Sequence, residues 1–216
     1  MNGKEKIFIV GDIHGCLDML KRLMDEIDWN PLLDQLIFIG DYIDRGEDPK
    51  GVVDFILHLK KESPLVRCLV GNHEKMLLDY LSGIDRQSFL INGGDATLRS
   101  YKEARLKDSE PLFPRSHLNF FSFLLPMIEL DNYYVVHAGF RPYINIEDQD
   151  LDDMIWIRDE FIYSDYDFGK VVIFGHTAFE KPMIMKNKIA IDTGAVYGNY
   201  LTCLELPEKK FHSVKA

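Results

Sequence analysis

The sequence is organised around residues 37–46, which read Ile37-Phe38-Ile39-Gly40-Asp41-Tyr42-Ile43-Asp44-Arg45-Gly46. The branched and aromatic residues before Gly40 predict a buried strand that runs into a loop. That loop carries two carboxylates, Asp41 and Asp44, followed by the guanidinium of Arg45. Carboxylates can bind cations, and the planar fork of an Arg side chain matches phosphate geometry. The stretch therefore predicts a strand followed by a loop that binds charged groups.

The same pattern occurs on both sides of this stretch. An apolar run at 7–10 precedes the loop 11–15, and another at 66–70 precedes the loop 71–74. Apolar residues at helical spacing follow each of the three loops, so we expect three successive βα units. Ligands of open α/β sheets bind beyond the carboxyl ends of the strands. We therefore expect the polar loop residues to converge on one site: Asp12, His14, Asp41, Asn72 and His73.

The remainder of the chain continues this organisation. Further strands are expected at 133–136, 171–174 and 189–191, and they end at His137, His176 and Asp192. Between 89 and 127 the period is irregular, which predicts a helical insert around 84–128 that covers one edge of the cleft. A last strand is expected at 200–206, followed by a mobile polar tail at 207–216. We expect residues 1–216 to form a single domain.

Composition excludes several functional classes. The 216 residues include 46% hydrophobic and 28% charged side chains, as in globular proteins, and the net charge of -10 argues against nucleic-acid binding. The 3 cysteines have no CxxC spacing, which favours reduced thiols. The N-terminal segment 1–6 is polar, and the apolar run after it is too short for a signal or membrane segment. We expect a cytoplasmic protein without a membrane partner.

The clustered donors suit a two-metal site. Two divalent ions can clamp a phosphoryl group and lower the pKa of a shared water. Asp41, whose two oxygens can reach two cations, is the predicted bridge. One ion would be held by Asp12, His14 and Asp41. The other would be held by Asp41, Asn72, His137 and His176. Nitrogen and oxygen donors without thiolates favour Mn, with Fe and Zn as alternatives.

The motifs also carry a family resemblance. Gly11-Asp12-Ile13-His14-Gly15, residues 40–46 and Gly71-Asn72-His73-Glu74, about thirty residues apart, resemble the three signature motifs of the phosphoprotein phosphatase family of binuclear metallophosphoesterases. His137-Ala138-Gly139 and Gly175-His176 resemble its two later metal-histidine motifs. The similarity spans roughly residues 7 to 205. It implies the calcineurin-like α/β fold, in which central mixed β-sheets form a sandwich flanked by helices.

The resemblance also implies roles at the site. It assigns the same two metal groups, makes His73 the general acid and gives Asp44 as its partner. Arg45 and Arg158 match the phosphate-clamping arginines of the family, and Asn72 would also contact the substrate. The implied reaction is direct attack of a metal-bridging hydroxide on phosphorus, without a phosphoenzyme intermediate. No protein nucleophile is needed.

The substrate is less sharply defined. Residues 137–142 and 191–198 look like the bacterial branch of the family, which includes phosphatases for phosphoserine, phosphothreonine and sometimes phosphotyrosine, and diadenosine tetraphosphate hydrolases. The complete Asp44-Arg45-Gly46 and Glu74 favour a phosphatase acting on phosphoproteins. The first alternative is a symmetrical diadenosine tetraphosphate hydrolase that acts on a phosphorylated small molecule. The second is a non-catalytic, metal-dependent protein that recognises phosphate, which would be expected to lack His73, Asp44 or a ligand.

Other polar residues have weaker signals. Glu74 is expected to be a charge at a helix N-terminus, where acids complement the helix dipole. Three histidines lack motif context and are expected to be solvated or structural: His58, His117 and His212. Three residues border the predicted cleft, where they either shape the loop or contact the substrate: Asp192, Thr193 and Tyr197.

Overall fold

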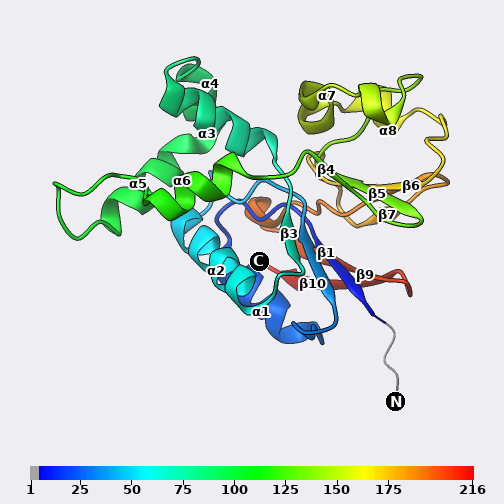
Figure 1. Ribbon diagram of the computed structural model, residues 1–216, viewed down its shortest axis with the longest axis horizontal. Coiled ribbons are helices and arrows are strands. Elements are labelled where there is room, and N and C mark those ends of the chain that lie inside the picture. The colour runs from blue at the N-terminus through cyan, green and yellow to red at the C-terminus, as the bar shows by residue number, and fades with distance from the viewer. Residues whose placement is uncertain (1–4) are drawn as a thin grey trace.

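The structure of the protein is a computed structural model that describes residues 5–216. The first four residues of the polar N-terminal segment lie outside this range. Within it, the chain forms two five-stranded sheets with helices around them (Figure 1). The predicted α/β fold class, with mixed sheets flanked by helices, is confirmed.

The first sheet has the strand order β10-β9-β1-β2-β3. Its strands are β1 (Ile7–Val10), β2 (Gln35–Phe38), β3 (Val66–Cys68), β9 (Tyr200–Leu206) and β10 (Lys210–Lys215). β1, β2 and β3 are parallel, whereas β9 is antiparallel to β1 and β10 is antiparallel to β9. The carboxyl ends of the three parallel strands therefore lie at one edge of the sheet.

The second sheet has the strand order β4-β5-β6-β8-β7. Its strands are β4 (Met127–Glu129), β5 (Tyr133–Val136), β6 (Val171–Phe174), β7 (Met183–Ile184) and β8 (Lys188–Ala190). β5, β6 and β8 are parallel, while β4 and β7 are antiparallel strands at the two edges. As in the first sheet, the carboxyl ends of the parallel strands therefore lie on one side.

The two sheets pack face to face and form a sandwich. Ile9 and Ile37 of the first sheet lie in one buried cluster with Val135 and Ile173 of the second. Phe8, next to Ile9 in β1, points to the opposite face and packs with the helices. Because both faces of these strands are buried, they appear in the sequence as continuous apolar runs rather than as alternating patterns.

Helices cover the outer faces of the sandwich. They are α1 (Leu17–Glu26), α2 (Pro49–Glu62), α3 (Asn72–Ser82), α4 (Gln87–Phe89), the π-helix η1 (Leu90–Gly94), α5 (Asp95–Glu103), α6 (Arg115–Ser122), the 3-10 helix η2 (Ile146–Asp148), α7 (Leu151–Trp156), α8 (Asp159–Ile162) and the 3-10 helix η3 (Ala195–Tyr197). In Figure 1, α1 to α6 lie beside the first sheet and α7 and α8 beside the second. None of the helices in residues 5–216 has the length and apolar character that crossing a membrane requires.

The segment predicted as a helical insert, around 84–128, contains α4, η1, α5 and α6 and ends in β4. Of these helices, α5 and α6 pack against α2, and α6 also contacts α3. The last of these helices, α6, begins at Arg115 and ends at Ser122. Its Phe120 and Phe121 lie in the core.

The prediction of a mobile tail at 207–216 is wrong. Residues 210–215 form β10, which pairs along its length with β9. The polar composition hid this strand, because its buried face carries His212 as well as Val214. His212 Nε2 lies 2.7 Å from Glu205 Oε2, and Lys6 Nζ lies 3.0 Å from Glu205 Oε1. These contacts join β10 and the residue before β1 to the side chain of a β9 residue.

The Glu205 cluster should make stability depend on pH. Burial alone would raise the pKa of Glu205, but hydrogen bonds from His212 and Lys6 lower it below its ordinary value. A lowered carboxyl pKa contributes stability above the unfolded value of about 4.3, and this is lost as the pH falls through the folded pKa. We expect Glu205→Gln to lower the free energy of unfolding by roughly 1.5–3 kcal/mol at pH 7. The difference should shrink below about pH 4, as urea unfolding at both pH values would measure.

The exposed Glu208 provides the control for this measurement. Glu208→Gln should stay close to the wild type at both pH values, because surface substitutions usually change stability by less than about 0.5 kcal/mol. Equal stability of Glu205→Gln and the wild type at pH 7 would show that the ionised side chain contributes nothing to the pairing of β9 and β10.

Candidate active site

The six predicted metal ligands follow parallel strands of both sheets. Asp12 and His14 follow β1, Asp41 follows β2, Asn72 follows β3, His137 follows β5 and His176 follows β6. All six side chains are buried. Backbone hydrogen bonds from the N–H groups of Ile13 and His14 to the carbonyl of Asp41 join the first two loops. The structure thus brings together residues that lie up to 164 positions apart in the sequence.

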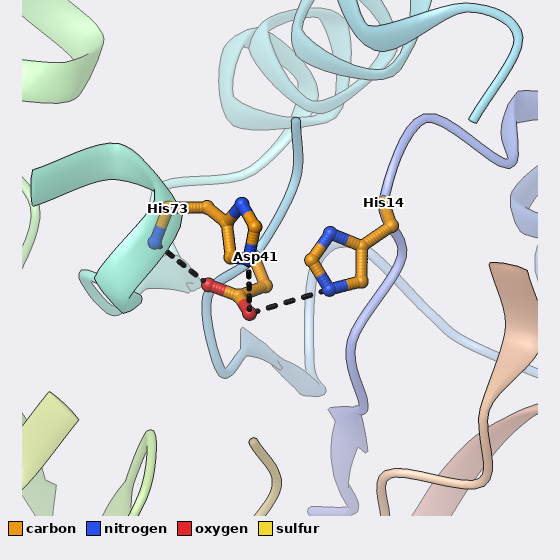
Figure 2. Close-up of side chains that lie close together, drawn as sticks. All are labelled: His14, Asp41 and His73. Atoms are coloured by element: carbon orange, nitrogen blue, oxygen red, sulfur yellow. Dashed lines mark hydrogen bonds and ion pairs between the residues drawn. The ribbon is translucent and has the colours of Figure 1, made fainter. Parts of the chain in front are cut away.

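Asp41 lies at the centre of this arrangement. Its Oδ2 is 3.3 Å from His14 Nε2 and 3.9 Å from His73 Nε2, and its Oδ1 is 3.4 Å from His137 Nε2. Figure 2 shows His14 and His73 turned toward the Asp41 carboxylate. Potential ligand atoms of His14, Asp41 and His73 form one group within 4.8 Å, and those of Asp41, His137 and His176 form another. Asp41 is the residue that both groups share.

Asn72 adds an oxygen donor to the second group. Its Oδ1 lies 3.1 Å from His137 Nε2 and 2.9 Å from His176 Nδ1. The position of Asn72 is set by α3, because it is the first residue of that helix and follows Gly71. A carboxylate, an amide oxygen and two imidazoles therefore meet at one point.

Asp12 belongs to neither of the two groups. Its Oδ2 accepts the backbone N–H of His176 at 3.0 Å, and its buried Oδ1 has no partner within residues 5–216. Burial, together with the carboxylates of Asp192 and Asp41, raises the pKa of Asp12 well above its ordinary value. Enclosing several carboxylates in one cavity is unfavourable unless a cation neutralises them. The unpaired oxygen of Asp12 is thus suited to a positive ion.

The donor set fits divalent metal ions. Burial alone would raise the pKa of Asp41, but His137, His73 and His14 lower it well below its ordinary value, so Asp41 is a carboxylate ready to bind a cation. Burial is also the main reason why the pKa of His137 is lowered, which favours the neutral imidazole that metals bind. Carboxylate, amide and imidazole donors without thiolates are the combination expected for Mn, Fe or Zn.

His73 is oriented by Asp44. Its Nδ1 lies 2.6 Å from Asp44 Oδ2, and both side chains are almost completely buried. With Nδ1–H donated to the carboxylate, Nε2 faces the Asp41 side of the cavity. The other oxygen of Asp44 accepts a hydrogen bond of 2.6 Å from Thr97 Oγ1. No motif in the sequence points to Thr97, because it is a single hydroxyl in an amphipathic helix.

Both predicted arginines reach the cavity, which has a volume of about 120 Å³. Arg45 Nη1 lies 2.8 Å from His14 Nε2, and its guanidinium lies 5.7 Å from the ring centre of Tyr197. A metal ion at His14 would need the lone pair that Arg45 now contacts. Arg158 Nη1 donates to the carbonyl of His176 and to Thr177 Oγ1. The two cations therefore line the same cavity as His73.

Two further acids lie next to the site. Glu74 occupies the third position of α3, as expected for a charge at a helix N-terminus. Its carboxylate also accepts the backbone N–H groups of Asp41 and Tyr42, at 2.9 Å each, which the sequence did not predict. Asp192 is buried, lines the cavity and accepts the N–H of Gly194. Asp192 therefore both shapes its loop and borders the cavity.

The other residues singled out in the sequence differ in whether they line the cavity. Thr193 Oγ1 hydrogen-bonds to β9, at Thr202 Oγ1 and the carbonyl of Tyr200, and so supports the loop after β8. Tyr197 lines the cavity and is 67% exposed, so its ring is available to a substrate. The three histidines without motif context lie outside the cavity. His58 is exposed, His117 bonds to Tyr101 and Asp54, and His212 bonds to Glu205.

The chain is similar to phosphoesterases over nearly its whole length. The family model for calcineurin-like phosphoesterases matches residues 5–200. Serine/threonine-protein phosphatase 1 of Salmonella typhimurium is 33% identical over 205 residues, which cover 91% of this chain and 89% of that protein. The asymmetrical bis(5'-nucleosyl)-tetraphosphatase PrpE of Oceanobacillus iheyensis is 28% identical over 234 residues, covering 97% and 92%.

A solved structure agrees with the family match. A crystal structure of a protein provisionally described as a diadenosine tetraphosphatase superposes with a TM-score of 0.76 at 24% identity, covering 100% of this chain and 95% of that one. At this level of identity the likeness shows the fold, while the family model and the relatives identify the type of protein. Together with the Asp and His clusters around Asp41, they show that the chain belongs to the calcineurin-like phosphoesterase family of metal-dependent hydrolases.

Proposed function

We propose that the protein hydrolyses phosphate monoesters and that its substrates are phosphoserine and phosphothreonine residues of proteins, with phosphotyrosine as a further substrate. The observation that carries this proposal is that His73, paired with Asp44, lines the same small cavity as Asp41, Asn72 and the two arginines. A proton donor, cation-binding groups and anion-binding groups in one cavity are what phosphoester hydrolysis requires. The similarity to the Salmonella typhimurium serine/threonine phosphatase supports the choice of substrate.

The proposed metal ligands form two sets that share Asp41. Asp12, His14 and Asp41 would hold one divalent ion. Asp41, Asn72, His137 and His176 would hold the other. When bound, the two ions supply charge neutralisation at the phosphoryl group and lower the pKa of a water molecule toward neutrality. We propose Mn, with Fe and Zn as the other candidates for this donor set.

The remaining site residues would act directly on the substrate. Arg45 and Arg158 carry guanidinium groups on the cavity wall, where their planar donors can bind the phosphoryl oxygens. Asn72 offers its amide N–H₂ group to the same oxygens. His73 would donate a proton from Nε2 to the leaving oxygen, while Asp44 accepts the Nδ1–H and keeps the ring in place.

A second candidate is the hydrolysis of dinucleoside polyphosphates. A groove of about 610 Å³ borders the cavity at Asp41 and shares with it the lining residues Arg45, Ala195 and Val196, which favours a substrate larger than a phosphate monoester. The relative from Oceanobacillus iheyensis is described as asymmetrical, whereas the sequence suggested the symmetrical reaction. Asymmetrical cleavage of diadenosine tetraphosphate would release AMP and ATP, and symmetrical cleavage would release ADP. The non-catalytic alternative is not retained, because the chain belongs to an enzyme family and keeps His73 and Asp44.

A substrate panel with added Mn tests the choice. We expect inorganic phosphate to be released from p-nitrophenyl phosphate and from phosphoserine and phosphothreonine peptides, with a higher kcat/KM than for diadenosine tetraphosphate. The nucleotide products should be separated by chromatography. A higher kcat/KM for diadenosine tetraphosphate would instead establish the nucleotide hydrolase, and its products would identify the site of cleavage.

Replacing the proposed general acid should slow turnover without releasing metal. We expect His73→Asn to lower kcat on a phosphoserine peptide by ~10²–10⁴-fold, the usual contribution of general acid catalysis. Metal content, measured by atomic emission spectrometry, should stay near the wild type. The exposed His58 gives the matched control, His58→Asn, which should keep full activity. A wild-type kcat for His73→Asn would remove His73 from the mechanism.

Replacing the shared carboxylate should affect both metal sites. Asp41→Asn removes the negative charge common to the two donor groups, so we expect the bound metal to fall below two ions per chain and activity to fall with it. Dialysis against Mn followed by metal analysis measures this. Asp25→Asn, at an exposed position, is the control. Retention of two tightly bound ions by Asp41→Asn would contradict a bridging role.

A further inference from the structure

The hydroxyl of Thr97 contacts both the backbone and the side chain of Asp44. Thr97 Oγ1 accepts the Asp44 N–H at 2.9 Å and donates to Asp44 Oδ1 at 2.6 Å. Thr97 and Asp44 are both fully buried, although 53 residues separate them in the sequence. One hydroxyl therefore satisfies the N–H group of Asp44 and one of its two carboxylate oxygens.

The same carboxylate orients His73. Asp44 Oδ2 pairs with His73 Nδ1 at 2.6 Å, so each oxygen of Asp44 has a different partner. A carboxylate held at one oxygen only can still rotate about its Cβ–Cγ bond. With Thr97 bonded to the other oxygen, that rotation is restricted. The chain of hydrogen bonds from Thr97 through Asp44 to His73 thus fixes the plane of the imidazole.

The backbone of the Asp44 loop needs this support. Asp44 and Arg45 have φ values of 71° and 67°, in the left-handed region that residues other than Gly seldom adopt. Two hydrogen bonds from the insert stabilise this pair: Thr97 Oγ1 accepts the N–H of Asp44, and the carbonyl of Gly93 accepts the N–H of Arg45 at 3.1 Å. Both acceptors come from the short segment 93–97, where η1 passes into α5.

We propose that Thr97 is a positioning residue for the reaction, which acts through Asp44 to hold the proton donor His73 at the leaving oxygen. This inference rests on the proposed function of the His73–Asp44 pair. The proposal gives the insert a role in the reaction, because its helix α5 supplies a side chain on which the orientation of the proton donor depends. Thr97 itself does not line the cavity.

The test separates positioning from simple packing. Thr97→Val keeps the shape of the side chain and removes the hydroxyl, whereas Thr97→Ser keeps the hydroxyl. If Thr97→Val does not fold, Thr97→Ala takes its place. Ser100→Ala is the matched control on the same helix, since Ser100 Oγ bonds to Asp48 and not to Asp44. All variants would be assayed with Mn on phenyl phosphate and p-nitrophenyl phosphate. The phenolate is the more basic leaving group and depends more on the proton donor.

We expect Thr97→Val to lower kcat on phenyl phosphate by about 10-fold, because the Asp44 carboxylate loses the hydrogen bond from the hydroxyl and the Asp44 N–H loses its acceptor, and on p-nitrophenyl phosphate by about 2-fold or less. KM should change by less than about 2-fold on both, since no group that contacts substrate is removed. Thr97→Ser should restore the wild-type ratio, and Ser100→Ala should leave it unchanged. A wild-type kcat for Thr97→Val, or an equal loss on both substrates, would overturn the proposal.

A proton NMR spectrum provides a readout that does not depend on activity. A short hydrogen bond to a carboxylate moves the His73 Nδ1 proton far downfield, and the resonance is assigned by its absence in His73→Asn. We expect Thr97→Val to shift or broaden this resonance and Thr97→Ser to retain it. An unchanged resonance in Thr97→Val would overturn the proposal. A wild-type enzyme that hydrolyses neither aryl phosphate would instead refute the proposed function, while the spectrum would still decide whether Thr97 orients His73.

Discussion

The geometry of the site depends on one buried carboxylate, that of Glu74, which joins the loop after β2 to the start of α3. It accepts backbone N–H groups from Gly71, Asp41 and Tyr42. Buried N–H groups without partners are costly, so this carboxylate allows two chain segments to meet in the interior. The contact is close: a Cβ at Gly71 would lie 2.2 Å from Asp41 Oδ1. Burial and Asp41 raise the pKa of Glu74 to about 8, which reflects the cost of enclosing acids together.

The loops that carry the site also have a strained backbone. Five of the predicted site residues have φ values between 46° and 71°: His14, Asp41, Asp44, Arg45 and His176. Each such residue costs on the order of 1 kcal/mol. The cost is offset by hydrogen bonds that cross between loops, such as those from His14 to Asp41 and from Gly15 to Tyr42. The strained turns direct side chains from both sheets into one cavity, which regular loops would not do.

The sequence predicted the strands that carry the site because these strands are buried on both faces and read as apolar runs. It missed β10, whose buried His212 depends on pairing with Glu205, and β4 and β7, which are edge strands of the second sheet and are not buried on both faces. It anticipated that the loops converge, since parallel strands share an edge. It could not predict that Thr97 bonds to Asp44, because that contact depends on how α5 packs and follows no local pattern.

The pairing of β1 with β9 also affects how the chain folds during its synthesis. Ile7 lies opposite Leu206 in the sheet, so β1 is flanked on one side by a strand that the ribosome makes much later. β2 can cover one edge of β1 early, but the other edge stays unpaired until β9 has been made. Contacts between residues so distant in sequence slow folding and leave a strand edge open to aggregation. A chain that stops before β9 would therefore leave one edge of β1 without its partner strand.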